Sequence, residues 1–599
     1  MASRQKVGRR SASVISGGPR RERGRKKAPA GPLEGERGTW RKKWTDRLPV
    51  ALIFPNTYAV AASNLGWQLV YDLLNEHPGV VAERFVLSDP DVRPLSLESG
   101  RPLTDFALVC YSLSFEGDSL ALLQILAAGG LTLEAAARDE AHPLVIGGGV
   151  GVWLNPEPLA PATDLFILGE AEVALPRVLQ FLVEQWPRQG RRLLPQMADQ
   201  FPACYVPALY RPSYDEQGRL TAMAVEGNAP ARIVPAVLRE PEPTAGEPPL
   251  IAGYSRLLSP QAEFSDLFLV ELGRGCSRAC RFCAAGFIYR PPRLWSPAAI
   301  RAALDHCPPE IKRVGLLGME MAAPETLAEI SGLIADRGKS LSFSSLRADA
   351  LSPALLDLLA ASRIKTAVLA PDGSSERLRR VINKGLSEEG ILRAGEALAA
   401  IGVTTLKLYC MIGLPGEEDE DLLELVGMIR RLKQVLLGLG RVRGRLTEIQ
   451  LSVSSFVPKP WTPFQYHPFA GVAELRRRLQ LLQGELASEA NVRIGAEAPD
   501  KAYFQAVVAR GDRRLGLALI AMARGEQSGN WRRQMLGLGV DPEWYASRIR
   551  EPEERFPWEI VDPGIKARFL AAEYRRALAG QSGQPCQVET CRRCGVCGG

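Results

Sequence analysis

The feature that most constrains this fold is an alternation of short apolar segments with helical patterns, which occurs twice along the chain. In the first part, helical patterns such as 66–76 and 120–128 separate five apolar runs, at residues 50–54, 85–87, 106–112, 144–147 and 165–168. Buried parallel strands joined by crossover helices produce this pattern. The sequence therefore predicts an α/β fold that begins with a doubly wound, Rossmann-like domain over residues 48–190.

The second alternation covers residues 263–470. Six apolar segments are expected to be strands, at residues 267–272, 313–317, 341–345, 365–369, 404–410 and 448–454. Six parallel strands with outer helices predict a partial (β/α)6 barrel. Residues 191–262 are rich in proline and predict a linker with some strand. Helical patterns at 473–490 and 501–524 predict a mainly helical C-terminal region over 471–585.

Charge is distributed unevenly along the chain. Residues 1–47 contain 15 lysines and arginines against four acidic residues, a balance of +11, whereas the whole chain carries +7, which leaves −4 for the rest. This basic stretch lacks apolar periodicity, so we expect a disordered, solubilising tail, with an RNA-binding arm as the alternative.

No apolar run reaches the roughly 18 residues of a membrane span, and no signal core precedes the domains, which predicts a cytoplasmic protein.

Three cysteines follow the first strand of the predicted barrel. Cys276, Cys280 and Cys283 form a C-x3-C-x2-C run, and Gly273 and Gly275 turn the chain just before it. Thiolates at this spacing hold three irons of a 4Fe–4S cluster and leave the fourth iron open, an arrangement that suits S-adenosylmethionine as a ligand. Zinc would need a fourth ligand nearby, and no histidine is close in sequence. An odd number of cysteines disfavours disulfides.

This run resembles the CxxxCxxC motif of the radical S-adenosylmethionine (radical SAM) superfamily, in which an aromatic residue precedes the last cysteine. Segments 344–349, 370–385, 408–417 and 456–465 resemble further stretches of the same family. The resemblance implies a low-potential electron donor such as a flavodoxin or a ferredoxin. It also implies that the cofactor is contacted by Phe282, Glu320, Ser345, Arg347, Gly413 and Pro415. Two departures are Met319, where the family has glycine, and Asp372, where it has glutamate.

A glycine-rich turn, residues 147–151, follows the fourth strand of the first domain. Glycines there let a large planar or phosphate-bearing cofactor approach the backbone. With segments 154–158 and 164–172, the turn resembles the cobalamin-binding domain that precedes many radical SAM enzymes. The resemblance implies cobalamin contacts from Gly147, Gly148, Gly149, Gly169 and Glu170. No histidine lies near residues 54–66, so cobalamin is expected to bind without a histidine ligand; the alternative is a domain that keeps the fold but has lost the cofactor.

Four more cysteines lie near the end of the sequence. Cys586, Cys591, Cys594 and Cys597 form a C-x4-C-x2-C-x2-C pattern. Four thiolates can bind zinc tetrahedrally, and the spacing also suits a second iron–sulfur cluster. Unliganded thiols are the third alternative.

The resemblances together imply an enzyme that reductively cleaves S-adenosylmethionine at the cluster and generates a 5′-deoxyadenosyl radical. With methylcobalamin as the methyl donor, the expected activity is a cobalamin-dependent methyltransferase acting on an unactivated carbon. The substrate is unknown, and RNA is one candidate. One alternative is a methylthiotransferase-like RNA-modifying enzyme, since residues 456–465 resemble that group. Another is a nucleic-acid-binding protein with a structural cluster.

Overall fold

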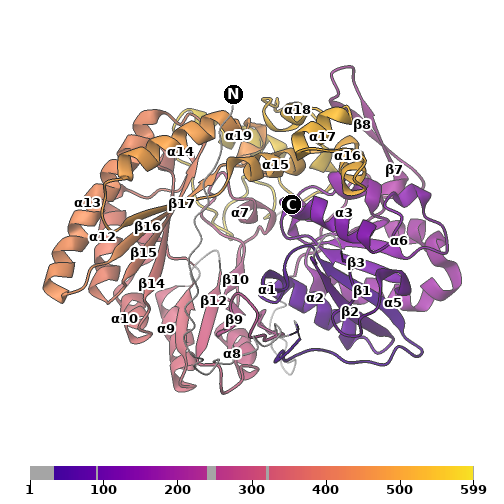
Figure 1. Cartoon of the computed structure of the whole chain (residues 1–599), viewed down its shortest axis with the longest axis horizontal. Coiled ribbons are helices and arrows are strands. Elements are labelled where there is room, and N and C mark those ends of the chain that lie inside the picture. The colour runs from indigo at the N-terminus through magenta and orange to yellow at the C-terminus, as the bar shows by residue number, and fades with distance from the viewer. Residues whose placement is uncertain are drawn as a thin grey trace, which may run out of the picture.

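Two α/β units stand side by side and share a cover of C-terminal helices (Figure 1). The computed structural model describes residues 31, 33–88, 92–238, 251–318, 323–343 and 345–597. The N-terminal unit, drawn in indigo and purple, is the first domain. The barrel, in pink and orange, lies beside it, and the late helices run above both. Most of the predicted basic tail, residues 1–30, lies outside the described residues.

The first domain is a six-stranded sheet in the order β2-β1-β3-β4-β5-β6. The strands are β1 (Leu48–Phe54), β2 (Val80–Val86), β3 (Leu108–Ser112), β4 (Leu144–Gly148), β5 (Leu165–Ile167) and β6 (Cys204–Tyr205). The first five pair in parallel, and β6 is antiparallel at the edge. The strand order reverses between β1 and β3, which is where open α/β sheets bind ligands. The predicted doubly wound fold is confirmed.

Helices cover both faces of this sheet, so its strands are mostly apolar, and the buried Glu83 and Arg84 of β2 are exceptions. The covering helices are α2 (Leu65–Glu76), α3 (Ser119–Ala128) and α5 (Ala171–Gln189), with the short α1 (Tyr58–Ala61) and α4 (Val150–Leu154) in the loops. All five residues of β3 are buried. Helix α2 begins where the Asn64 side chain accepts a hydrogen bond from the Trp67 amide, an ordinary N-cap.

The end of the predicted basic tail is folded rather than disordered. Glu36 forms an ion pair with Arg84, and both side chains are fully buried. Trp44 packs edge-on against Phe106 at 4.9 Å between ring centroids. The indole of Trp40 donates to Asp72 at 2.7 Å. The prediction of disorder for residues 1–47 is therefore wrong for residues 33–47, because three side chains there find partners on the first domain.

The barrel contains the six predicted strands. These are β9 (Leu267–Glu271), β12 (Arg313–Leu317), β13 (Ser340–Phe343), β14 (Thr366–Asp372), β15 (Thr405–Ile412) and β16 (Glu448–Ser455). Together with a seventh strand, β17 (Val492–Ala496), they form two parallel sheets, ordered β13-β12-β9 and β14-β15-β16-β17. A parallel bridge between Leu346 and Leu369 connects the two sheets. The outer helices are α8 (Pro297–Asp305), α9 (Pro324–Asp336), α10 (Pro353–Ala361), α11 (Glu376–Val381), α12 (Glu388–Ala400), α13 (Asp419–Arg443) and α14 (Val472–Leu486).

A seventh strand extends the second sheet. Strand β17 (Val492–Ala496) pairs in parallel with β16. It lies in the region predicted to be mainly helical. The prediction missed it because the segment is short and half-exposed, so pairing with β16 rather than an apolar run defines it.

The linker contains α6 (Leu194–Gln200) and a hairpin of β7 (Tyr210–Tyr214) and β8 (Leu220–Val225). The C-terminal helices are α15 (Pro499–Ala509), α16 (Arg513–Ala523), α17 (Trp531–Gly537), α18 (Pro542–Ala546) and α19 (Ala567–Leu578). The single helix predicted over 501–524 is two helices, because Asp512 caps a new start by accepting from the amides of Arg514 and Leu515.

Within the described ranges, no helix combines the length and apolarity needed to cross a membrane.

The C-terminal helices are fixed to the first domain through the segment 154–158. The side-chain amide of Asn155 donates to the carbonyls of Ala509 and Gly511, at 3.1 and 2.8 Å. The buried carboxylate of Glu157 pairs with Arg513 at 2.8 Å. A segment that resembled part of a cofactor signature thus joins two regions of the chain.

Candidate functional site

The cysteine run lies on a loop at the C-terminal end of β9. A short strand, β10 (Gly273–Arg274), pairs antiparallel with β11 (Arg293–Leu294), and helix α7 (Ala285–Ile288) follows the last cysteine. Burial is the main cause that raises the pKa of Cys280 to about 12, with Lys384 acting to lower it and Cys283 acting to raise it. Burial likewise raises the pKa of Cys283, with a contribution from Cys276. The three cysteines therefore share one buried, electrostatically coupled environment.

This environment suits a cluster better than a single ion. Within the ranges the structure describes, no three histidine, cysteine, aspartate or glutamate side chains lie close enough to hold one metal ion. In a 4Fe–4S cluster each cysteine binds a different iron, so the sulfurs lie farther apart than around zinc. The donor set of three thiols fits the predicted cluster.

A buried arginine holds the loop in place. Arg281, between the second and third cysteines, is fully buried. Its guanidinium donates to the carbonyl of Val381 at 2.8 Å, at the end of α11, and pairs with Glu573 of α19 at 3.1 Å. Its amide donates to the carbonyl of Ile382 at 2.9 Å. No pattern in the sequence identifies Arg281, because its partner Glu573 lies 292 residues away.

Three residues predicted to contact S-adenosylmethionine follow strands β12 and β13, and the structure describes two of them. Glu320 lies outside the described residues. Ser345 is exposed, and Arg347 donates two hydrogen bonds to Asp349, at 2.8 and 2.9 Å. The guanidinium of Arg347 is therefore already paired with a carboxylate of the protein, whereas it was predicted to bind the carboxylate of the cofactor.

A second ion pair lies close to the cysteines. Lys384 pairs with Asp372 at 2.6 Å, and both side chains are largely buried. Both residues act electrostatically on Cys280. Asp372 was noted only as a departure from the family, and Lys384 was missed, since no spacing in the sequence links it to the cysteines.

The turn after β15 is fixed by a buried carboxylate. Glu417 accepts from the amide of Gly413 at 2.5 Å, from Ser374 at 3.1 Å and from Arg478 at 2.7 Å. Gly413 has a φ of +82°, which favours glycine. Pro415 is buried in the same turn. Phe282 is partly buried and packs against an apolar cluster that includes Leu378, Leu414 and Phe456, so it supports this side of the loop.

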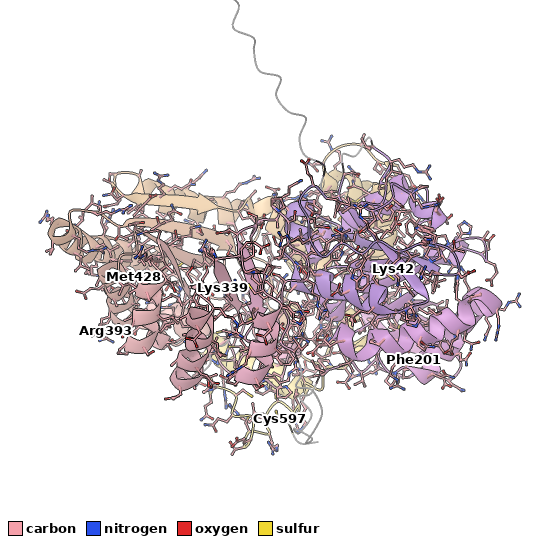
Figure 2. All side chains as sticks on the ribbon, turned by 90° about the horizontal axis from the view of Figure 1, so that it is seen from below. Lys42, Phe201, Lys339, Arg393, Met428 and Cys597 are labelled. Atoms are coloured by element: carbon pink, nitrogen blue, oxygen red, sulfur yellow. The ribbon has the colours of Figure 1, made fainter. Side chains whose placement is uncertain are left out.

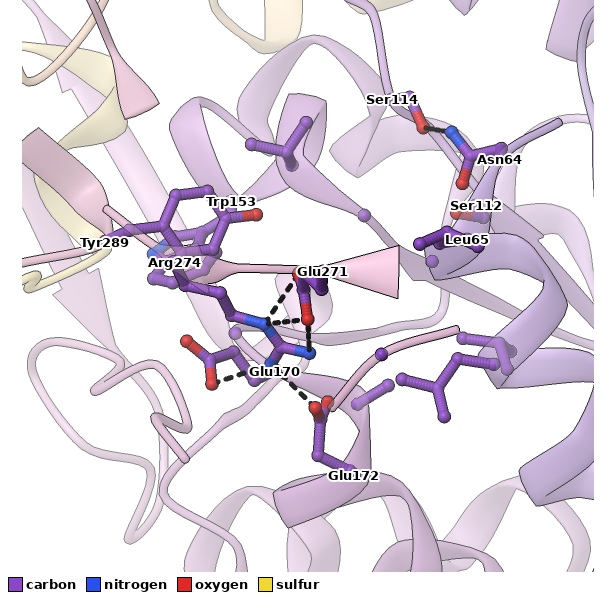
Figure 3. Close-up of a pocket in the computed structure, with 18 of the residues that line it drawn as sticks. Asn64, Leu65, Ser112, Ser114, Trp153, Glu170, Glu172, Glu271, Arg274 and Tyr289 are labelled. Atoms are coloured by element: carbon purple, nitrogen blue, oxygen red, sulfur yellow. Dashed lines mark hydrogen bonds and ion pairs between the residues drawn. The ribbon is translucent and has the colours of Figure 1, made fainter. Parts of the chain in front are cut away.

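A cavity of about 390 Å³ lies between the first domain and the barrel. Figure 3 shows it bounded by loops of both units. From the first domain it is lined by Asn64, Leu65, Gly66, Ser112, Ser114, Gly149, Trp153, Gly169, Glu170 and Glu172, and from the barrel side by Gly253, Tyr254, Arg256, Glu271, Gly273, Arg274 and Tyr289. Its walls include Arg274, two residues before Cys276.

A smaller, apolar space of about 70 Å³ continues from this cavity into the first domain. It lies between the sheet and helices α2 and α5, and it shares Gly149 and Gly169 with the larger cavity. None of the lining residues of either space is a histidine. The crevice at the reversal of strand order is thus a two-part space, with a larger part that polar, charged and apolar side chains line together and a smaller part that is apolar.

The glycines of this site differ in whether the surrounding packing leaves room for a side chain. A Cβ on Gly147, Gly149 or Gly169 would lie within 2.5 Å of Tyr111, Leu113 or Ala236, respectively, so packing alone excludes a side chain there. A Cβ on Gly148 would meet nothing closer than 3.7 Å. Gly148 lines the apolar space, and its small size is not demanded by the protein's own packing.

Glu170 joins the two units. Its carboxylate pairs with Arg274 at 3.0 Å (Figure 3). It also pairs with Arg293 at 2.5 Å and accepts from the amide of Leu238 at 2.8 Å. Glu172 pairs with the same Arg274 at 2.6 Å. A residue predicted to contact a cofactor is thus engaged by two barrel arginines, although it also lines the cavity.

The terminal cysteines lie against the same loop. The amide of Cys586 donates to the carbonyl of Ser277 at 2.6 Å, and Cys594 is buried. The amide of Lys566 donates to the carbonyl of Cys594 at 2.8 Å. The two cysteine groups were predicted as two separate sites, whereas in the structure the terminal group lies against the loop that carries the first group.

Two families match the chain. "Radical SAM proteins, N-terminal" matches residues 66–207, and "Radical SAM superfamily" matches residues 270–429. An uncharacterized protein of Methanocaldococcus jannaschii is 26% identical over 468 residues, which cover 78% of this chain and 89% of that protein. The ribosomal protein uS12 methylthiotransferase RimO of Acidothermus cellulolyticus is 28% identical over 241 residues, which cover 37% of this chain and 50% of that enzyme.

Among solved structures, the cobalamin-dependent radical enzyme OxsB is 14% identical, with a TM-score of 0.40; the match covers 64% of this chain and 52% of OxsB. The radical methyltransferase TsrM of Kitasatospora setae is also 14% identical, with a TM-score of 0.40, over 67% of this chain and 72% of TsrM. The family matches place the cysteine loop within the radical SAM domain. The chain therefore contains a radical SAM domain over residues 270–429, preceded over residues 66–207 by a region that matches the N-terminal domain of radical SAM proteins.

Proposed function

We propose that this protein is a cobalamin-dependent radical SAM methyltransferase that acts on an unactivated carbon. The observation that carries the proposal is the two-part cavity at the strand-order reversal of the first domain, which opens within two residues of the cysteine loop. When bound, the 4Fe–4S cluster supplies the electron that cleaves S-adenosylmethionine, and methylcobalamin supplies the methyl group. A radical SAM enzyme also needs an electron donor.

The chain's own residues have distinct tasks in this proposal. Cys276, Cys280 and Cys283 would hold three irons of the cluster. Lys384 places a positive charge beside Cys280, which favours its thiolate. Arg274, held by Glu170 and Glu172, lines the cavity two residues before Cys276 and would fix the position of the loop beside the cavity.

The cavity suits a corrinoid held without a histidine ligand. Gly148 leaves room in the smaller, apolar part for a planar group to approach the backbone, and the larger part offers Asn64, Ser112 and Ser114 as partners. No histidine is among the lining residues, so the corrinoid is expected in a base-off form.

The cobalamin part is tested by Gly148→Trp, which fills the apolar space without a clash of its Cβ. The wild-type protein, refolded or purified with hydroxocobalamin under anaerobic conditions, should retain about one corrinoid per chain, as one site allows. The variant should retain none. Gly484→Trp, on an exposed surface of α14, is the matched control and should bind as the wild type does. Equal retention by both variants would contradict the proposal.

The cluster part is tested by Cys280→Ala. With the four terminal cysteines also changed to alanine, the variant should lose the 4Fe–4S absorption and all reductive cleavage of S-adenosylmethionine, since two thiolates do not hold the site-differentiated cluster. Cleavage is measured as 5′-deoxyadenosine by mass spectrometry. Cys307→Ala in the same background should retain both signals.

The second candidate is a methylthiotransferase-like activity on RNA or on a protein. The match to a ribosomal protein methylthiotransferase favours it. The two activities add different masses to the product, a methyl or a methylthio group. Mass spectrometry of RNA, proteins and metabolites from cells with and without this chain distinguishes them, and a methylthio product would replace the methyltransferase proposal.

A further inference from the structure

The terminal cysteine segment is built onto the outer side of the cluster loop. After α19, the amide of Gly583 donates to the side chain of Asn383 at 2.8 Å, and that side chain donates to the carbonyl of Ala279 at 3.1 Å. Three residues later, the amide of Cys586 donates to the carbonyl of Ser277. Hydrogen bonds thus attach the start of the segment to residues between Cys276 and Cys280.

The four terminal cysteines lie near one another at this surface. Cys586, Cys591 and Cys594 line one small cavity, whose other lining residues are Ala279, Phe287, Arg290, Phe569, Glu573, Gln584 and Arg593. Burial raises the pKa of Cys586, and the other three terminal cysteines raise it further. Figure 2 shows Cys597 on one face of the molecule, beneath the junction of the barrel and the first domain.

A buried arginine faces this group without a carboxylate partner. Arg290 is only 4% exposed, and its guanidinium lies 4.3 Å from the ring centroid of Phe287 and 5.5 Å from that of Phe569. Its Nε donates to the carbonyl of Gly286 at 3.0 Å. In the part of the chain that the structure describes, no carboxylate forms an ion pair with it. The nearby Arg281, by contrast, pairs with Glu573.

The carboxylate of Glu573 lines the same cavity but is paired with Arg281 and Arg576. Because a buried charge is costly without a counter-charge of its own, an anion beside Arg290 would stabilise the site. Cys586 and Cys597 both lie within its electrostatic reach. A metal centre held by four thiolates is anionic and would supply the missing charge. Since no three of these thiols converge on a point where a single ion could bind, a cluster, which spreads its ligands over four irons, fits better than zinc.

We propose that Cys586, Cys591, Cys594 and Cys597 hold a second 4Fe–4S cluster that passes electrons to the cluster on Cys276, Cys280 and Cys283. This inference rests on the proposed radical SAM function. A low-potential donor of the flavodoxin or ferredoxin class loses one electron and reduces the terminal cluster from the 2+ to the 1+ state. That cluster returns to 2+ when it reduces the loop cluster by one electron. No bond forms or breaks in the transfer.

Metal content tests the terminal site. The full-length chain, a variant with all four terminal cysteines changed to alanine, and a variant with the three loop cysteines changed to alanine are reconstituted anaerobically with iron and sulfide. Iron, sulfide and zinc are then measured. Each variant should contain about four irons fewer per chain than the full-length protein. Unchanged iron in the terminal variant, or one zinc in place of the cluster, would overturn the inference.

The two proposals can fail separately in this design. If the loop variant keeps cleavage of S-adenosylmethionine, the radical SAM function itself is wrong. If the loop variant loses cleavage but the terminal variant keeps its full iron content, only the second cluster is wrong.

The electron path is tested by comparing two reductants. Dithionite is small and can reach the loop cluster directly, whereas a reduced flavodoxin must dock on the surface. In the terminal variant, the ratio of flavodoxin-driven to dithionite-driven cleavage should fall well below that of the full-length protein. An unchanged ratio would show that the terminal segment carries no electrons.

Arg290→Met offers a test that leaves every cysteine in place. Loss of the buried cation disfavours addition of an electron, so the midpoint potential of the terminal cluster should become more negative. The potential is measured by a redox titration followed by electron paramagnetic resonance, in the variant that lacks the loop cysteines. Arg393→Met, on an exposed surface, is the control. Equal potentials in the two variants would contradict the role given to Arg290.

Discussion

The loops at the C-terminal ends of the strands are held differently in the two α/β units. In the first domain, glycines shape them: Gly149 and Gly169 have φ values of +98° and +103° and touch neighbouring backbone. In the barrel, buried charged side chains fix the loops, with Arg281 behind the cysteines and Glu417 behind the turn after β15. A loop shaped by glycine presents bare backbone to a large cofactor. A loop held by ion pairs keeps its ligand side chains in position.

The largest expected effect is that of Arg281→Met. Removing this guanidinium leaves Glu573 buried, although Arg576 still contacts it at 3.0 Å. Breaking a buried ion pair in this way typically costs about 3–5 kcal/mol. Urea denaturation should show the loss, and the variant should bind less iron. The double variant Arg281→Met/Glu573→Gln should recover part of the stability; no recovery would mean that the carbonyl contacts of Arg281, rather than the ion pair, hold the loop.

Glu170→Gln should have a smaller effect on the junction between the two units. The change removes the charge that pairs with Arg274 and Arg293, while Glu172 and Glu271 still contact Arg274. Hydrogen bonds to charged groups contribute about 1.5–3 kcal/mol, so we expect a loss of that order. Limited proteolysis of the segment that links the units is the second measurement. If cutting is no faster than in the wild type, Glu170 does not hold the units together.

Gly149→Ala tests the glycine side of the comparison. Gly149 has φ +98° and ψ 167°, a region open essentially to glycine, and its Cβ would lie 2.5 Å from the carbonyl oxygen of Leu113. Such backbone strain costs about 1–3 kcal/mol. The midpoint of thermal unfolding should fall whether or not cobalamin is present, and a variant as stable as the wild type would show that the loop adapts.

Gly148→Ala, one residue earlier, should have the smallest effect. Its Cβ meets only ordinary contacts, and its φ lies outside the range that favours glycine. Substitution at a compatible glycine changes stability by about 0.4–1 kcal/mol, usually upward. A strong loss of stability here would mean that Gly148, like Gly149, is required by the fold and not kept for a ligand.

Much of the fold was predictable because periodicity is local. The six barrel strands and the five parallel strands of the first domain follow from apolar runs, whereas the break between α15 and α16, which depends on the capping residue Asp512, was not predicted. The cysteine loop was predictable for the same reason, since its three thiols lie within eight residues. What could not be predicted depends on distant partners. Glu573 behind Arg281, Arg293 on Glu170 and Cys586 beside Ser277 follow from the fold, and no spacing in the sequence reveals them.

The contact between Arg281 and Glu573 also sets an order of events during synthesis. The ribosome makes the cysteine loop 292 residues before the glutamate that anchors it. At about 5–20 residues per second, that interval lasts roughly 15–60 seconds. During this time the loop cannot yet be locked by α19, and the terminal cysteines do not yet exist. Iron and sulfide that reach the growing chain would therefore meet a loop that α19 does not yet hold. The loop would be fixed only once α19 is made and Glu573 pairs with Arg281.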